Sequence, residues 1–373
     1  MKTINIMLKP ASSLCNMRCR YCFYADVSAM RDVHSFGIMS DETLTAILTN
    51  VRGETEAGDS VQFTFQGGEP TLAGLPFFRR FVSLTSDWKD VRVSYALQTN
   101  GLLLDDGWCA FLAEHRFLVG LSLDFLPHAH DAVRVDERGA GTYERICAGM
   151  ACMKKYGVEF NVLCTLTDEA ARHPKQVWEQ IVRLGIDFTQ FTPCLGNLEG
   201  DTPYALSPRL FASFYTELFA YWYADFQRGK HRSIKFFDDV VNLLVLGVPT
   251  SCGMNGACHP QLVVEADGSV YPCDFYCLDE YKLGNITVQP LSELMQSPAL
   301  SAFLHRPHRM PDLCGKCRYR QFCGGNCKRM QGEICCSGAD DFCGYQHFLD
   351  KWGGVLSRLA GQVRRSLAAR GKQ

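Results

Sequence analysis

Nineteen cysteines in a chain of 373 residues are the feature that most constrains how this protein folds. Hydrophobic residues make up 47% of the chain, so it can bury a sizeable core without disulfides to staple it. Three cysteines lie within the first 22 residues and eleven lie between residues 252 and 343. Such closely spaced cysteines are typical of ligands for a metal or a cluster, so we predict metal binding.

Charge and hydrophobic patterning narrow the class of protein. The 38 basic and 40 acidic residues give a formal charge of -2, which argues against a general nucleic-acid binder. No apolar run approaches the roughly 18 residues of a membrane helix. The N-terminal segment is a poor signal peptide because Lys9 and Pro10 interrupt its apolar part. We therefore predict a cytoplasmic protein with no nucleic-acid or membrane partner.

Residues 1–245 alternate short strand-like runs with amphipathic helical segments such as 41–52 and 142–157. The strand candidates are TINIMLKP, VQFTFQ, VSYALQT, FLVGLSLD, VEFNVLCT and DFTQFTPC. Six βα units predict a parallel sheet, open or closed only in part into a barrel. Ligands in such folds bind beyond the carboxyl ends of the strands, which here carry residues 66–69 and 98–100, Ser122 and Asp124.

The pattern changes near residue 246, so we predict a second domain over 246–345. It begins with a stretch rich in Gly, Pro and Cys, and continues with a β-hairpin (QLVVEADGSVYPC) turned by Asp267 and Gly268. A helical segment over 291–304 leads into a dense Cys/Gly stretch from 314 to 343. Residues 346–373 have Leu and Val at helical spacing, which predicts a packed terminal helix with a basic, solvated face.

Cys15, Cys19 and Cys22 form a C-x3-C-x2-C triad directly after the first predicted strand. Thiolates suit iron–sulfur clusters, and four cysteines normally hold a four-iron cluster, so three leave one iron open to a small molecule. Zinc is the alternative, but it would require a fourth nitrogen or sulfur ligand. The nearest candidates, His34 and Cys109, lack the usual pairing with the triad.

The triad and the aromatic residues that follow it, Phe23 and Tyr24, resemble the motif of the radical S-adenosylmethionine (SAM) superfamily. The resemblance implies an α/β fold, a partial (β/α)6 barrel over residues 1–245. It also implies that SAM chelates the open iron and is cleaved by an electron from the cluster to a 5′-deoxyadenosyl radical. The protein then positions the target and excludes water.

Further residues match the SAM contacts of this superfamily. FQGGEP resembles its GGE motif, in which Gly67 and Gly68 let the backbone approach the methionyl end of SAM, with Glu69 nearby. A Gly-Gly turn without a ligand is the alternative. The further matches are Gln98, Ser122 and Arg134 for the ribose and carboxylate, and Leu195 for the adenine. The guanidinium fork of Arg134 suits a carboxylate. The alternatives are that Arg134 is an exposed surface arginine and that Leu195 is a core leucine.

The C-terminal cysteines resemble the SPASM extension of peptide-modifying radical SAM enzymes. The matching residues are Cys258, Gly268 and Cys273, then C-x2-C-x5-C-x3-C over 314–327, and Cys343. By that resemblance Cys252, Cys258, Cys273 and Cys327 hold a first auxiliary four-iron cluster. Cys314, Cys317, Cys323 and Cys343 hold a second, which makes three [4Fe-4S] clusters in all.

Two alternatives remain open for these cysteines. Taken alone, Cys314, Cys317, Cys323 and Cys327 would suit one all-thiolate zinc site. Eight more cysteines have no predicted role and are expected to be small buried hydrophobes: Cys109, Cys147, Cys152, Cys164, Cys194, Cys277, Cys335 and Cys336. Among them, Cys335 and Cys336 offer a spare ligand near the second cluster.

Longer stretches, such as FQGGEPTLAGLPFF, SCGMNGAC and DGSVYPCDFYCLDEYKLGNI, closely resemble anaerobic sulfatase-maturating enzymes. The resemblance implies oxygen-independent oxidation of a serine or cysteine in a C/S-x-P-x-R motif of an unfolded sulfatase to Cα-formylglycine. A flavodoxin or ferredoxin would supply electrons. One alternative is a radical SAM maturase of a ribosomal peptide that forms a thioether, a crosslink or an epimer. The other is a zinc-binding module without catalysis.

The resemblance also implies roles for three further residues. Asp274 is the base that takes the proton of the substrate radical, while an auxiliary cluster takes its electron, and Tyr24 and Gln66 lie near the substrate. The alternative makes Asp274 an acceptor of backbone N–H bonds in its loop. One residue departs from the family pattern: Phe125 stands where Gly is usual, which puts the Ser122 and Arg134 contacts in question.

Overall fold

The structure is a computed structural model that describes residues 1–199, 202–306, 310–336 and 341–370, with only the backbone at 336 and 370. The chain divides into two compact units. The first comprises 1–123, 130–161 and 260–306, and the second comprises 124–129, 162–259 and 307–373. In the described ranges, no helix has the length and apolar character needed to cross a bilayer.

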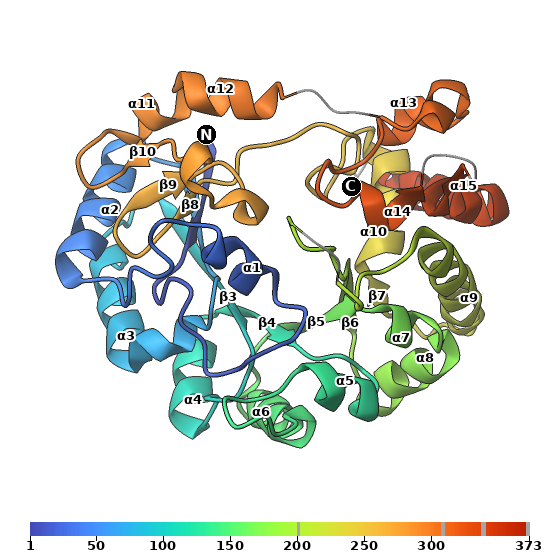
Figure 1. Ribbon diagram of the computed structural model, residues 1–373, viewed down its shortest axis with the longest axis horizontal. Coiled ribbons are helices and arrows are strands. Elements are labelled where there is room, and N and C mark those ends of the chain that lie inside the picture. Colours follow the sequence, from blue (N-terminus) through green and yellow to red (C-terminus); the bar gives the residue numbers. More distant parts are fainter. Residues whose placement is uncertain (200–201, 307–309, 337–340, 371–373) are drawn as a thin grey trace. The chain divides into compact units, whose positions relative to one another are not determined.

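Strand β1 (Thr3–Leu8) lies at the middle of the sheet in the first unit. Figure 1 labels β3, β4, β8, β9 and β10 of this sheet. On one side it pairs in parallel with β2 (Ser60–Phe65), which is followed by β3 (Arg92–Thr99) and β4 (Leu118–Ser122), also parallel. On its other side lies β8 (Val263–Val264), parallel to β1, followed by the antiparallel strands β9 (Ser269–Tyr271) and β10 (Gly284–Asn285). The predicted hairpin of the second domain therefore extends the sheet of the first.

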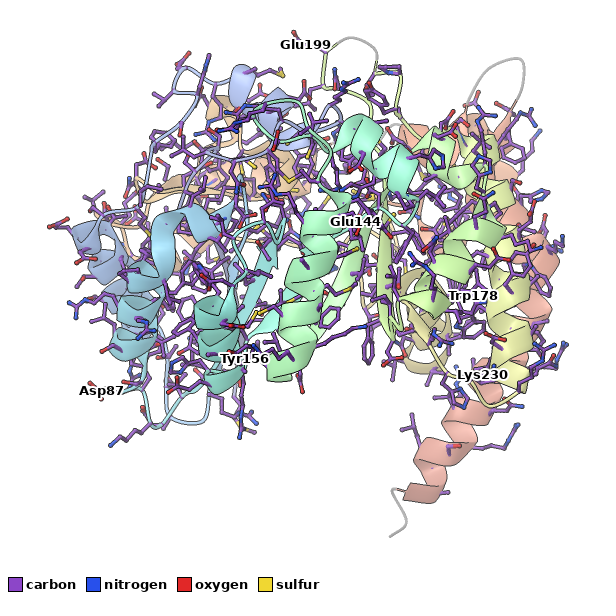
Figure 2. The ribbon with its side chains drawn as sticks, turned by 90° about the horizontal axis from the view of Figure 1, so that it is seen from below. Asp87, Glu144, Tyr156, Trp178, Glu199 and Lys230 are labelled. Carbon is purple, nitrogen blue, oxygen red and sulfur yellow. The ribbon has the colours of Figure 1, made fainter. Side chains whose placement is uncertain are left out.

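Helices of the first unit follow these strands along the chain. They are α1 (Phe23–Ala29), α2 (Asp41–Gly53), α3 (Gly74–Thr85), α4 (Asp106–Glu114), α6 (Tyr143–Tyr156), α11 (Leu291–Met295) and α12 (Pro298–Leu304), with 3₁₀ helices at Pro70–Ala73, Asp274–Tyr276 and Asp279–Tyr281. Figure 2 shows α6 between Glu144, near its start, and Tyr156 at its end. Beside that end, Lys155 donates a 2.9 Å hydrogen bond to Asp106 of α4, which joins the two helices.

The core of the first unit forms because alternate residues of β2 point to one face. Phe63 and Phe65 are fully buried there and meet the aromatic face of α3. The ring centroid of Phe65 lies 4.9 Å from that of Phe78 and 4.8 Å from that of Phe81, in edge-to-face geometry. This packing fixes β2 and with it the residues that follow its carboxyl end.

The second unit carries three parallel strands, β5 (Phe160–Leu166), whose first two residues belong to the first unit, β6 (Phe188–Pro193) and β7 (Ser233–Ile234). Its helices are α7 (Asp168–Ala171), α8 (Pro174–Arg183), which bears Trp178 (Figure 2), α9 (Pro208–Gln227), α10 (Lys235–Leu246), α13 (Arg320–Cys323), α14 (Gln331–Ile334) and α15 (Gly344–Arg370), with α5 (Pro127–Val133) at the division between the units. A 3₁₀ helix spans Asp312–Lys316, and β11 (Cys335–Cys336) pairs with β12 (Phe342–Cys343). The terminal helix α15 contacts α9, where Trp352 donates a 3.0 Å hydrogen bond to the carbonyl of Thr216.

The six predicted strands and the hairpin are confirmed, and the segment predicted to be helical over 291–304 is helical but interrupted. The segment 291–304 forms two helices, because Pro298 cannot continue the first and Ser297 instead caps the second through a 3.2 Å bond from the N–H of Leu300. Strand β7 was not predicted, since two residues carry no recognisable period. The compact units divide the chain differently from the predicted domains 1–245, 246–345 and 346–373, which stay predictions.

Candidate functional site

The cysteine triad lies in a loop between β1 and α1. Cys22 is the residue before the first turn of α1, and its N–H bonds to the carbonyl of Cys19 at 3.2 Å. Cys15 has both Cys19 and Cys22 as electrostatic neighbours, and burial raises its pKa to about 12. Three soft thiols therefore gather at one place, with each side chain partly accessible. This donor set fits a cluster with one open iron.

The GGE segment packs against that loop. A Cβ on Gly68, whose φ is +51°, would lie 2.2 Å from the carbonyl oxygen of Leu14, and the N–H of Glu69 donates to the same oxygen at 2.7 Å. The Glu69 carboxylate is buried and accepts bonds from Thr71, Thr99 and the N–H of Asn100. Gly68 and Glu69 thus brace the residues just before Cys15, whereas their predicted contact with SAM stays a prediction.

Gly68→Ala should displace the cysteine loop, because the added Cβ meets backbone that cannot move aside alone. We expect loss of about four irons per chain and of SAM cleavage, measured by iron analysis and 5′-deoxyadenosine assay. Gly157→Ala is the matched control, since Gly157 also has positive φ (+69°) but a Cβ there would meet nothing within 4 Å. Equal iron contents in the two variants would contradict this role for Gly68.

The other predicted SAM contacts fall in both units. Gln98 donates a 2.9 Å hydrogen bond to the hydroxyl of Ser122, so the ends of β3 and β4 bring these two together. Arg134 is only 7% exposed and lies over the ring of Tyr21 at 5.4 Å, which excludes the surface-arginine alternative. Leu195 is buried in the second unit. Whether these residues contact SAM stays a prediction.

A second group of predicted residues meets in the first unit around the carboxylate of Asp274. The hydroxyl of Tyr24 donates to Asp274 Oδ2 at 2.5 Å. The amide of Gln66 donates to the same oxygen at 3.1 Å and to the Tyr24 hydroxyl at 2.6 Å. Asp274 is 5% exposed, and its backbone N–H, rather than its carboxylate, bonds to Gln261 at 3.3 Å. The Asp274 carboxylate therefore accepts its hydrogen bonds from the side chains of Tyr24 and Gln66, whereas the alternative structural role required backbone N–H donors.

Burial and neighbouring charged groups together set the protonation of the groups around Asp274. Burial and the adjacent carboxylate raise the pKa of Tyr24 well above its ordinary value, so its hydroxyl stays a donor. Burial lowers the pKa of Lys9, but Cys277, Asp274 and Glu265 raise it more, so the net pKa lies above the ordinary value. The sequence reasoning missed Lys9 as a site residue. A lysine at the carboxyl end of a buried strand was the signal that could have found it.

The thiols predicted for the first auxiliary cluster lie in both units. In the second unit, Cys327 has Cys252 and Cys258 as its thiol neighbours. A Cβ on Gly253 would lie 2.7 Å from Cys327 Cβ, so the two segments touch through a glycine. Cys273, the fourth predicted ligand, belongs to the first unit, and its membership of this set stays a prediction.

The thiols predicted for the second auxiliary cluster line one cavity of the second unit: Cys314, Cys317, Cys323 and Cys343. Four thiols around a cavity fit a fully ligated four-iron cluster. Cys335 lines the same cavity, with its Sγ 3.2 Å from that of Cys343. Cys327 is not among the residues that line this cavity. The cavity therefore does not support the alternative of one zinc site formed by Cys314, Cys317, Cys323 and Cys327. In the described part of the chain, no three His, Cys, Asp or Glu side chains are arranged to hold one metal ion.

Most of the unassigned cysteines follow the expectation of buried hydrophobes. Cys109, Cys164, Cys194, Cys277 and Cys335 are buried, Cys147 and Cys152 are partly exposed, and the Cys336 side chain lies outside the described residues. Phe125 is also a core residue, because its ring packs 5.9 Å from that of Phe191 within the second unit. The core of the second unit therefore accommodates the phenylalanine that stands where the family usually has glycine.

Comparison with known protein families matches two domain families to the chain. The radical SAM superfamily matches residues 10–181, and the SPASM iron–sulfur cluster-binding domain matches residues 256–318. The parallel strands do not close into a full barrel in the described residues. The predicted fold class, an α/β radical SAM partial barrel with a SPASM domain, is confirmed.

Relatives resemble the chain over most of its length. A cysteine-type anaerobic sulfatase-maturating enzyme of Clostridium perfringens is 42% identical over 88% of this chain and 90% of its own. A serine-type enzyme of Bacteroides thetaiotaomicron is 29% identical over 88% and 83%. A structure of anSMEcpe with bound AdoMet and the Cp18Cys peptide superposes with a TM-score of 0.88, at 37% identity over 97% and 99% of the chains. SuiB of Streptococcus suis, bound to the precursor peptide SuiA, shares the fold alone, at TM-score 0.58 and 15% identity over 87% and 71%.

Proposed function

The chain belongs to the anaerobic sulfatase-maturating enzymes, which are SAM-binding radical SAM enzymes, and on that premise we propose that it oxidises a cysteine of a sulfatase to Cα-formylglycine. The cysteine preference is supported by identities of 42% and 37% to cysteine-type relatives against 29% to a serine-type one. Membership of this enzyme family excludes the zinc-binding module without catalysis.

The observation that carries this proposal is the environment of Asp274. Its Oδ2 accepts bonds from Tyr24 and Gln66, while Oδ1 faces the Lys9 ammonium at 3.3 Å. Among the described residues, none donates a hydrogen bond of good geometry to Oδ1. A buried carboxylate with one oxygen held by two hydrogen bonds, and the other without a hydrogen-bond donor of good geometry, is suited to receive a proton.

The oxidation removes one hydrogen atom, one proton and one electron from the substrate. A Cβ–H bond of the substrate cysteine breaks, the thiol proton passes to Asp274 Oδ1, and the remaining electron leaves, so that a carbon–sulfur double bond forms. Water then replaces sulfur and gives the aldehyde and hydrogen sulfide. When bound, SAM and its cluster supply the hydrogen-abstracting radical, and an auxiliary cluster supplies the electron acceptor. Tyr24 and Gln66 orient the carboxylate and help to exclude water from it.

We also propose three [4Fe-4S] clusters, held by the ligand sets predicted above. The gathering of three thiols near Cys15 and of four around the cavity at Cys314 supports two of these sets. The partner is an unfolded sulfatase segment with a C/S-x-P-x-R motif. The flavodoxin or ferredoxin donor and the cytoplasmic location stay predictions.

Reaction with paired peptides tests the proposal. The reconstituted enzyme is incubated without oxygen with SAM, reductant and a short peptide carrying either C-x-P-x-R or S-x-P-x-R. We expect 5′-deoxyadenosine and an aldehyde product by mass spectrometry, formed faster from the cysteine peptide. Deoxyadenosine without aldehyde from either peptide would refute the function. Faster oxidation of the serine peptide would refute the preference alone.

A further inference from the structure

Lys9 is a buried lysine that has no role in the proposed oxidation. It directly follows β1 and is only 3% exposed. Its aliphatic stem passes Gly67, whose φ is +91°, and a Cβ there would lie 2.6 Å from Lys9 Cγ. Any side chain at position 67 would therefore displace Lys9, so this glycine of the GGE segment makes room for the lysine.

The Lys9 ammonium contacts both ends of one short segment. Its Nζ lies 3.3 Å from Asp274 Oδ1 and donates to Cys277 Sγ at 3.2 Å. Asp274 begins the 3₁₀ helix Asp274–Tyr276, and Cys277 directly follows it. The same ammonium lies 4.9 Å from the ring centroid of Tyr24, the residue that restrains the other oxygen of Asp274. The Lys9 side chain, at the end of β1, therefore contacts both ends of the segment that carries Asp274, the proposed base.

A second buried pair supports this contact. Glu265 Oε1 lies 3.7 Å from Lys9 Nζ and 2.6 Å from the Arg31 guanidinium. The group contains two cations and two carboxylates, which satisfies the requirement that buried charges be paired. Cys277 is fully buried, and its Sγ accepts the hydrogen bond from Lys9 Nζ.

We propose that Lys9, with Cys277 as its second anchor, is a positioning residue that holds the Asp274 carboxylate in one orientation beside Tyr24 and Gln66. This inference rests on the proposed role of Asp274 as base. It accounts for Cys277, a buried cysteine that matches no ligand of the family. Because Lys9 acts through Asp274 and not on the substrate, its loss should impair the proton-transfer step and leave peptide binding unchanged.

The test compares Lys9→Met and Lys9→Arg in the reconstituted holoenzyme with the C-x-P-x-R peptide. A carboxylate misplaced by about 1 Å costs about a hundredfold in rate, so Lys9→Met should lower aldehyde formation about that much. Deoxyadenosine formation should fall less than about tenfold, while the KM for the peptide and the iron content stay unchanged. Lys9→Arg, which keeps the charge, should restore part of the aldehyde. The control is Lys155→Met, which removes an exposed ion pair with Asp106 and should change nothing.

Cys277 supplies a second test in case Lys9→Met does not fold. Cys277→Ala removes the acceptor and should lower the ratio of aldehyde to deoxyadenosine about tenfold, whereas Cys277→Ser keeps an acceptor and should leave it near normal. A normal ratio in Lys9→Met, or equal ratios in the two Cys277 variants, would overturn the inference. So would a parallel loss of iron, deoxyadenosine and aldehyde in folded Lys9→Met, since that would assign Lys9 to structure alone.

Asp274→Asn, measured in parallel, separates this inference from the proposed function. If Asp274→Asn abolishes the aldehyde and Lys9→Met does not lower it, only the role of Lys9 is wrong. If Asp274→Asn forms the aldehyde normally, the base assignment itself is wrong and the role of Lys9 falls with it.

Discussion

Asp274→Asn should abolish formylglycine formation while SAM cleavage continues at least in part. The variant keeps the size of the side chain, and its amide oxygen can still accept the bonds from Tyr24 and Gln66. It cannot take a proton at neutral pH, and loss of a general base costs about 10² to 10⁴ in rate. We expect aldehyde to fall by that factor, with deoxyadenosine reduced much less, measured on the same samples by mass spectrometry.

Asp279→Asn is the matched control for this variant. Asp279 begins the next 3₁₀ helix, is exposed, and accepts a 2.7 Å hydrogen bond from the N–H of Asp32. It should form aldehyde at the rate of the unmodified enzyme. Unchanged aldehyde formation in Asp274→Asn would show that Asp274 has a structural role and that another group takes the proton.

Double cysteine variants should show, by how much iron each loses, which cysteines share an iron–sulfur cluster. The unmodified chain is expected to bind about twelve irons, in three clusters of four. If Cys327 and Cys252 share one cluster, Cys252→Ala/Cys327→Ala should lose about four irons in total. If Cys327 and Cys343 belong to different clusters, Cys327→Ala/Cys343→Ala should lose about eight. Iron analysis and electron paramagnetic resonance of the reduced proteins measure both outcomes.

Cys147→Ala is the control for iron loss, since Cys147 has no predicted ligand role. It should keep all of the iron. A loss of only about four irons from Cys327→Ala/Cys343→Ala would place both cysteines on one cluster and contradict the proposed ligand sets. Zinc in place of iron in the unmodified protein would contradict the clusters altogether.

Local features were predicted well because their causes lie within a few residues. The triad from Cys15 to Cys22 is a single loop, so its spacing alone brings the thiols together. The strand-like run VQFTFQ predicted β2, and Asp267 with Gly268 predicted the hairpin of β8 and β9. The segment predicted to be helical over 291–304 contains a break before Pro298, which the apolar spacing did not predict because that spacing continues through a residue that cannot continue the first helix.

Partners far apart along the chain were missed or taken only from family resemblance. Lys9 was not predicted as a site residue, because its contacts with Asp274 and Cys277 join opposite ends of the chain and depend on β8 pairing beside β1. The separation of Cys327 from its sequence neighbours likewise came from the family and not from its spacing. Cys335 was expected to offer a spare ligand, but only the cavity places its thiol beside Cys343.

The fold class and the enzyme family could be predicted from the sequence because the motifs that carry the resemblance, and the spacing of the three cysteines proposed for the SAM cluster, are local properties of the chain. The surroundings of Asp274 could be seen in the tertiary structure alone. Its neighbours Lys9, Tyr24 and Gln66 come from the other end of the chain, and they meet it because the hairpin of β8 and β9 pairs beside β1 within the sheet. Burial at that junction requires each charge to have a partner, and this requirement places a lysine beside the proposed base.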